Sequence, residues 1–222
     1  MAPVTVVSGY VEIPDHPRGP HDYRALGQQL EDAVAAVGVP MVVADQEQVK
    51  DTWLARYLAK PANITHSIAD NAEKNSLAYH CVQHQKFAWI SAAPKIEPAD
   101  VIVWIDYGIL HVPGVTAEVI QKYLQRAGDY GSAVTLPGCW PKQKEIDPRF
   151  PHWRFCGGLI AVPLPLVRGF TSAAMGVALR QIEATKNVEW EVNTLARLEQ
   201  TGLVPMSWYH ADHTQEMFTN AP

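Results

Sequence analysis

The chain has 222 residues, of which 47% are hydrophobic and 18% are charged, and its formal net charge is -5. This length and composition predict a globular protein with one substantial core, and they exclude a largely disordered chain. The negative charge gives no general attraction to nucleic acids or anionic membranes. Three cysteines without a Cys-x-x-Cys pair favour neither a disulfide framework nor a structural zinc site.

The sequence shows no pattern typical of membrane insertion or secretion. No apolar run approaches the roughly 20 residues that a membrane-spanning helix needs. The first residues lead directly into a strand pattern, without a basic region or a cleavage site. We therefore expect a cytoplasmic protein without a membrane span.

The first elements in chain order have the signature of a βαβ unit. Residues 5–7 are an apolar strand that breaks at Ser8, Gly9 and Tyr10, before a loop over 14–20 that is rich in proline and glycine. From residue 22, apolar positions fall on one helical face up to Gly38, a predicted C-cap. The next apolar run, 39–44, ends at Asp45.

The rest of the chain continues to alternate helices with strands. The patterns predict helices over about 46–58, 71–90, 116–127, 166–185 and 189–200, and strands over 101–105, 133–136, 155–163 and 203–209. Thr116 is the predicted N-cap of its helix. Without an internal repeat or linker, this order predicts a single α/β domain over 1–222, with a mostly parallel central sheet flanked by helices.

The most informative segment is 101–108, Val-Ile-Val-Trp-Ile-Asp-Tyr-Gly, where five apolar residues end at Asp106. An apolar run without alternation is typical of a strand that is covered on both faces. Ligands bind at the carboxyl ends of the strands in such sheets. Asp106 is thus predicted to face a ligand, and Gly108 to let the backbone approach it. The alternative is an aspartate that only starts a turn.

Later segments add further candidate residues, each with a purely structural alternative. Gly157 and Gly158 begin a predicted strand, where a β-bulge is the alternative. Glu191 lies at a helix start, where an acid can simply complement the helix dipole. His210 and His213 are either ligands or surface histidines near the end of the chain.

Taken in order, these segments resemble the nucleotide-sugar-dependent glycosyltransferases of the GT-A type. More narrowly, they resemble the bacterial HtrL-type glycosyltransferases, in which a Trp-Ile-Asp-aromatic-Gly segment is a hallmark. The resemblance rests on residues 104–108, 155–159, 191–195 and 208–213. It implies a Rossmann-like GT-A domain, with a donor-binding half over about 1–110 and an acceptor-side half over about 111–222.

The resemblance also implies roles for individual residues. In this class a strand-end Asp-x-Asp holds a divalent cation that bridges the donor diphosphate, and here Gly108 replaces the second acid. Asp106 is then expected to bind Mn²⁺ or Mg²⁺ with His210 or His213. Asp106 and Glu191 are the expected catalytic residues, with Glu191 as general base if the reaction inverts the anomeric centre.

Donor and acceptor contacts follow from the same resemblance. The expected donor-binding residues are Ser8, Gly9, Tyr10, Asp45, Lys86, Asp106, Tyr107 and Gly108, with Lys86 directed toward the diphosphate. The expected acceptor-side residues are Trp140, Trp153, Gly157, Gly158 and Glu191. A nucleotide-sugar is the expected co-substrate, and the acceptor is a glycan, a lipid, a protein or a modified nucleobase.

Two other functions fit parts of the same pattern. A nucleotidyltransferase-like α/β enzyme also places an acid at a strand end, but the segment after the first strand has neither a GxGxxG nor a GxxxxGK motif. A non-catalytic module that binds nucleotides or carbohydrates would bind ligand without turnover. A serine hydrolase is disfavoured because the chain has no GxSxG motif.

Overall fold

The computed structural model describes residues 3–13, 22–46, 48–69 and 75–222. The predicted loop over 14–20 and the predicted helix start at 71 lie outside these residues. The described strands are β1 Val4–Val11, β2 Met41–Gln46, β3 Thr65–His66, β4 Val101–Ile105, β5 Val134–Gly138, β6 Leu159–Pro163, β7 Asn187–Val188 and β8 Met206–His210. The described α-helices are α1 Tyr23–Ala35, α2 Trp53–Leu58, α3 Leu77–Ala92, α4 Ala117–Leu124, α5 Leu164–Thr185, α6 Glu191–Thr201 and α7 Glu216–Thr219.

The central sheet has six strands in the order β2-β1-β4-β6-β5-β8. β1 runs parallel to β2 and β4, and β5 runs parallel to β8, whereas β6 is antiparallel to both of its neighbours. The predicted α/β fold with a mostly parallel sheet is confirmed. The antiparallel β6 places its first residue, Leu159, opposite Ile105 at the end of β4. The turn before β6 therefore lies at the edge where β4 ends.

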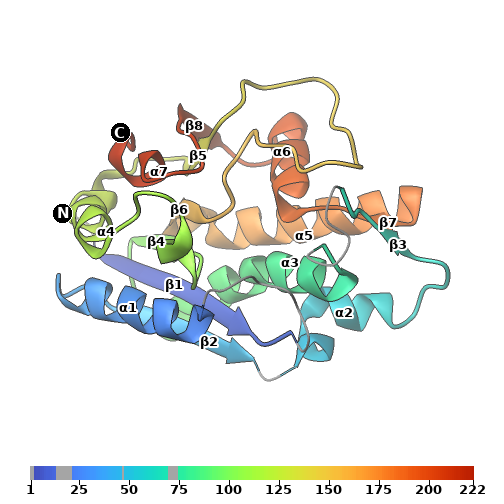
Figure 1. The fold of residues 1–222 in the computed structure, drawn as a ribbon. Coiled ribbons are helices and arrows are strands. Elements are labelled where there is room, and N and C mark those ends of the chain that lie inside the picture. Colours follow the sequence, from blue (N-terminus) through green and yellow to red (C-terminus); the bar gives the residue numbers. More distant parts are fainter. Residues whose placement is uncertain (1–2, 14–21, 47, 70–74) are drawn as a thin grey trace.

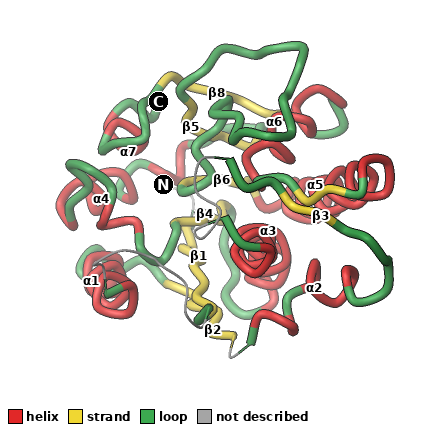
Figure 2. Tube along the Cα trace, turned by 45° about the vertical axis from the view of Figure 1, so that its right-hand side comes forward, coloured by secondary structure: helices red, strands yellow, loops and turns green. Residues whose placement is uncertain are grey.

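Helices cover both faces of this sheet, which gives the molecule three layers (Figures 1 and 2). On one face, α1, α4 and α7 bury Leu30, Ile120 and Phe218, and on the other, α3, α5 and α6 bury Phe87, Phe170 and Leu195. Strand β4 contributes to both layers, because successive side chains point to opposite faces of a strand. All five of its residues are buried, as its uninterrupted apolar run predicts.

Short polar side chains fix the starts of the helices. The Asp22 carboxylate accepts from the backbone N–H groups of Arg24 and Ala25 at the start of α1. Thr116 accepts from Val119 at the start of α4, which confirms its predicted capping role. The longest described helix, α5, has 22 residues, and within the described ranges no helix is long and apolar enough to cross a membrane.

Several predicted boundaries are wrong, for identifiable local reasons. The helix predicted over 46–58 is interrupted because Thr52 is extended, with ψ 148°, and its hydroxyl caps α2 instead. Residue 46 belongs to β2. The strand predicted from 155 begins only at Leu159, so Gly157 and Gly158 lie in the preceding turn. The two-residue strands β3 and β7, which pair with each other, are too short to leave an apolar pattern.

Candidate active site

A cleft opens where β1 and β4 end and β6 begins, and its empty volume is about 1160 Å³, with open solvent included. The structure brings together at this cleft Gly9, Tyr10, Asp106, Tyr107, Gly108, Trp153, Gly157, Gly158, Glu191 and His213. The predicted ligand-binding edge of the sheet therefore coincides with a real cleft.

Asp106 is the first residue after β4, and its backbone N–H donates to Gly158 O at 3.0 Å. Its carboxylate Oδ1 accepts from Trp104 Nε1 at 2.7 Å and from Lys86 Nζ at 3.3 Å. The side chain is 34% exposed, and Oδ2 accepts no hydrogen bond from any described residue. One oxygen is thus fixed by the protein, and the other is available to a ligand.

Lys86 lies beneath the cleft on α3, with its side chain 1% exposed. Besides its bond to Asp106, it donates to Glu191 Oε1 at 3.1 Å and to Gly157 O at 2.8 Å. The ammonium thus faces two carboxylates and a carbonyl, and the predicted contact between Lys86 and a donor diphosphate stays a prediction. Segments that are distant in the sequence meet at this one nitrogen.

The electrostatics of this group favour the ionised forms of Lys86 and Glu191. Burial would lower the pKa of Lys86, but the charges of Asp106 and Glu191 hold it above its ordinary value. Burial would raise the pKa of Glu191, but the Lys86 charge holds it below its ordinary value. With two carboxylates and one ammonium, the floor of the cleft has a net charge of about -1.

The glycines of the turn before β6 are needed for close packing. A Cβ atom on Gly157 would lie 2.4 Å from Glu191 Oε1, and one on Gly158 would lie 3.0 Å from Ile109 and 3.5 Å from Asp106 Oδ2. Neither glycine has a positive φ. Their missing side chains, rather than an unusual backbone conformation, allow the turn to lie against both acids.

The two other glycines at the cleft adjoin aromatic rings. A Cβ on Gly9 would lie 2.2 Å from Trp89, and one on Gly108 would lie 2.3 Å from Tyr23. Gly108 has φ -95°, which any residue adopts. The structure thus gives Gly108 a packing role against Tyr23, and the close approach of a ligand to its backbone stays a prediction.

Aromatic side chains form the walls of the cleft. At the β1 end, Tyr10 and Tyr107 have ring centroids 5.5 Å apart, and the Arg24 guanidinium lies 4.6 Å from the Tyr10 ring. Trp153 and His213, which also line the cleft, have ring centroids 5.4 Å apart. Flat aromatic surfaces of this kind suit the faces of nucleobases and sugar rings.

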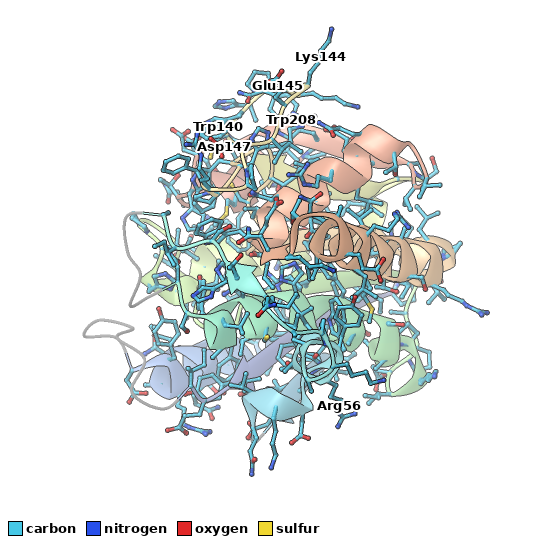
Figure 3. All side chains as sticks on the ribbon, turned by 90° about the vertical axis from the view of Figure 1, so that its right-hand side faces the viewer. Arg56, Trp140, Lys144, Glu145, Asp147 and Trp208 are labelled. Carbon is cyan, nitrogen blue, oxygen red and sulfur yellow. The ribbon has the colours of Figure 1, made fainter. Side chains whose placement is uncertain are left out.

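Besides Lys86, four predicted site residues do not line the cleft. Ser8 is buried and donates to Ile105 O at 2.7 Å, and Asp45 is exposed on β2, which β1 separates from β4. His210 ends β8, which β5 and β6 separate from β4. Trp140, labelled in Figure 3, is 37% exposed in the segment that follows β5, and its ring lies 5.3 Å from that of His152.

The predicted metal ligands are consequently not brought together as a set. Among the described residues, no group of three or more His, Cys, Asp or Glu side chains is arranged to hold a metal ion. Asp106 Oδ2 remains suited to a single bond to a hard cation, and His213 also faces the cleft. The residues present therefore fit a cation only where substrate phosphates supply most of its ligands.

Sequence reasoning missed several cleft residues, some of them on α3. Tyr79, Gln83 and Trp89 line the cleft from this helix. These three residues and Lys86 are spaced so that they lie on one face of the helix. A search for the face on which polar residues interrupt the apolar pattern could have identified it. Tyr23 and Trp190 also line the cleft, and no pattern in the sequence marks them.

The three layers, the strand order and the position of the cleft define a GT-A-like α/β fold. The same fold is found in a solved glycosyltransferase involved in the glycosylation of the major capsid of PBCV-1, with a TM-score of 0.57 and 12% identity. The match covers 95% of this chain and 81% of that one. Such low identity establishes a shared fold and no more.

Two further solved structures overlap more loosely. They are a CMP:2-keto-3-deoxy-manno-octonic acid synthetase complexed with CTP and a 4-diphosphocytidyl-2C-methyl-D-erythritol synthase from Anaerococcus prevotii. Their TM-scores are 0.44 and 0.41, each at 11% identity, over 98% and 99% of this chain and 96% of each of theirs. No family model matches the sequence, and curated protein sequences give no significant match. The narrower resemblance to HtrL-type enzymes stays a prediction.

Proposed function

We propose that this protein transfers a sugar from a nucleoside-diphosphate-sugar donor to an acceptor hydroxyl. The observation that carries the proposal is the pair Asp106 and Glu191, held by one buried lysine at a cleft in a GT-A-like fold. Charge that develops during glycosyl transfer needs carboxylates at fixed positions. The shared fold with a known glycosyltransferase supports this class of reaction.

Glu191 is the proposed catalytic residue on the acceptor side. It lies at the first position of α6, lines the cleft and remains ionised through its pairing with Lys86. In an inverting reaction, its carboxylate takes the proton of the acceptor hydroxyl as that oxygen attacks the anomeric carbon. In a retaining reaction, the same negative charge stabilises the positive character of the transferred sugar.

Asp106 is proposed to bind the donor through its Oδ2 atom. That oxygen accepts from a sugar or ribose hydroxyl, or it holds Mn²⁺ or Mg²⁺ together with the donor diphosphate and His213. A bound cation of this kind supplies positive charge to the departing nucleoside diphosphate. At the β1 end, the nucleobase stacks in this proposal on the rings of Tyr10 and Tyr107.

Trp153 is the proposed platform for the acceptor. Its backbone oxygen accepts from Cys139 and Trp140, which anchors its main chain to the end of β5. Its ring adjoins His213 at the cleft, on chain segments that follow the donor-side strands. An anchored indole lets an acceptor sugar stack with little loss of conformational freedom.

The proposal is tested by replacing Asp106 with Asn and measuring the release of UDP or GDP from a panel of hexose donors. Asp100→Asn is the matched control, since Asp100 is exposed just before the same strand. We expect Asp106→Asn to lose at least about 100-fold in turnover, as for other groups that stabilise developing charge, and Asp100→Asn to resemble the wild type. Near-normal turnover by Asp106→Asn would contradict the proposed function.

Two additions to this assay separate the alternatives. Exhaustive chelation should reduce turnover if Asp106 acts with a divalent cation, and undiminished turnover would mean that it binds the sugar or ribose directly. Incubation with nucleoside triphosphates and sugar 1-phosphates tests the nucleotidyltransferase reaction. Release of pyrophosphate there, without release of nucleoside diphosphate from the sugar donors, would favour that class instead.

A further inference from the structure

The Lys86 ammonium uses its whole donor capacity inside the protein. A lysine ammonium has three N–H donors, and here the three acceptors are Asp106 Oδ1, Glu191 Oε1 and Gly157 O. These acceptors come from the end of β4, the start of α6 and the turn before β6. The nitrogen also lies 5.5 Å from the ring centroid of Trp104, which itself donates to Asp106.

This arrangement leaves Lys86 no N–H for a substrate. Gly157 lines the cleft, and a Cβ added to it would lie 3.2 Å from Lys86 Nζ, so the glycine turn lies directly against the ammonium. A donor phosphate could pair with Lys86 only by breaking one of its three bonds. Lys86 therefore binds the two carboxylates, and it is the carboxylates that contact the ligand.

We propose that Lys86 is a positioning residue, which holds the carboxylates of Asp106 and Glu191 at fixed places on the cleft floor through the hydrogen bonds of its ammonium group. This inference rests on the proposed function for its catalytic consequence. Its structural content, the coupling of Glu191 to Lys86, can be tested without any substrate.

The physical reason is the repulsion between two acids that share one site. Like charges at short range disfavour simultaneous ionisation, and burial of Glu191 disfavours its charge further. The ammonium between them removes both penalties. Without the ammonium, one of the two carboxylates takes up a proton. The remaining hydrogen bonds then no longer fix which carboxylate oxygen faces the cleft.

The kinetic test compares Lys86→Met with Lys122→Met, a control whose lysine is 71% exposed and pairs only with Glu118 on its own helix. With the hexose donor panel, we expect Lys86→Met to lose at least about 100-fold in kcat, with KM for the donor changed less than about threefold. The Lys122→Met control should keep the kcat and the KM of the wild type. A raised KM with an unchanged kcat would mean that Lys86 contacts the donor, and it would overturn the proposal.

The substrate-free test follows the Glu191 carboxyl by NMR in protein labelled with ¹³C at glutamate Cδ, with Glu191→Gln used to assign its signal. The other charged or titratable groups around Glu191 are Asp106, His80 and His84. We expect the midpoint of the Glu191 titration to rise by at least one pH unit in Lys86→Met, at pH values where both proteins are folded. An unchanged midpoint would overturn the positioning role.

These two arms fail independently of the proposed function. If the wild type releases no nucleoside diphosphate from any donor, the proposed function fails, and the NMR titration still decides the role of Lys86. If Lys86→Met does not fold, the double variant Lys86→Met with Glu191→Gln removes the charge of the buried acid, Glu191. Recovery of the fold in the double variant would support the coupling, and failure to recover it would count against the coupling.

Discussion

At the scale of single residues, the site depends on small side chains as much as on charged ones. The Lys86 contacts exist because the Gly157 turn can lie against Glu191. Asp106 could be predicted from its strand alone, since a buried apolar run that ends in an acid has few interpretations. The role of Lys86 could not, because it depends on residues 86, 106, 157 and 191 meeting in three dimensions.

We expect Gly157→Ala to lose most turnover while the fold is kept. The added methyl group would lie 2.4 Å from Glu191 Oε1, so the carboxylate must move away from Lys86. Gly131→Ala is the control, because a Cβ there meets nothing within 4 Å. Donor turnover and the circular dichroism spectrum should be measured for both. Full turnover by Gly157→Ala would show that the position of Glu191 is not critical.

Acid should destabilise the protein through His80. Burial lowers the pKa of His80 to about 4 from an ordinary value of 6.5, so the unfolded chain binds a proton more readily than the folded one. Stability is therefore complete above pH 6.5 and falls as the pH is lowered toward 4. The loss approaches about 3 kcal/mol, at about 1.4 kcal/mol per pKa unit.

Denaturant unfolding at pH 7 and pH 4.5 measures this effect. His80→Gln should be less stable than the wild type at pH 7, because it alters a fully buried site, but its stability should change less between the two pH values. An identical pH dependence in the two proteins would remove His80 as a cause of the acid sensitivity.

At the scale of elements, the sequence predicted a helix or strand best where the pattern that defines the element lies within the element itself. The strand β4 and the start of α4 follow from an apolar run and from a capping threonine. The direction of β6 was not predicted, because nothing within Leu159–Pro163 encodes which neighbour it joins. The place of His210 outside the cleft was not predicted for the same reason: the sequence puts it at a strand end, but it does not tell that β5 and β6 lie between that strand and β4.

The cap of α4 gives a prediction that belongs to one element. Thr116→Ala removes the acceptor for the backbone N–H of Val119 and should cost about 1 kcal/mol in the free energy of unfolding. Thr116→Ser should retain most of that stability. Thermal denaturation of the three proteins measures the difference, which we expect to be about 2–4 °C for a chain of this size. Equal melting temperatures would mean that water replaces the hydroxyl without cost.

At the scale of the whole molecule, the two predicted halves are joined through the site itself. Lys86 and Asp106 belong to the segment 1–110, whereas Gly157 and Glu191 belong to 111–222. The pairing of β4 with β6 and the packing of α3 against α5 also join the two segments. A functional division at about residue 110 is therefore not a division into independent folding units.

We expect neither segment, 1–110 nor 111–222, to fold when produced alone. The first would expose the apolar edge of β4, and an exposed edge strand promotes aggregation. Size-exclusion chromatography and thermal unfolding of each fragment test this, with co-expression of both as the positive control. A soluble monomeric fragment 1–110 with a cooperative transition would contradict the expectation.

The place of β6 between β4 and β5 also has a consequence for synthesis on the ribosome. β5 is translated before β6, yet its only partners in the sheet are β6 and β8, which both come later. When Val134–Gly138 leaves the exit tunnel, it therefore has no strand to join, and β4 still has one open edge. β5 stays unpaired and β4 stays open at one edge until Leu159–Pro163 follows, and this is the stretch of translation in which a nascent-chain chaperone has most to protect.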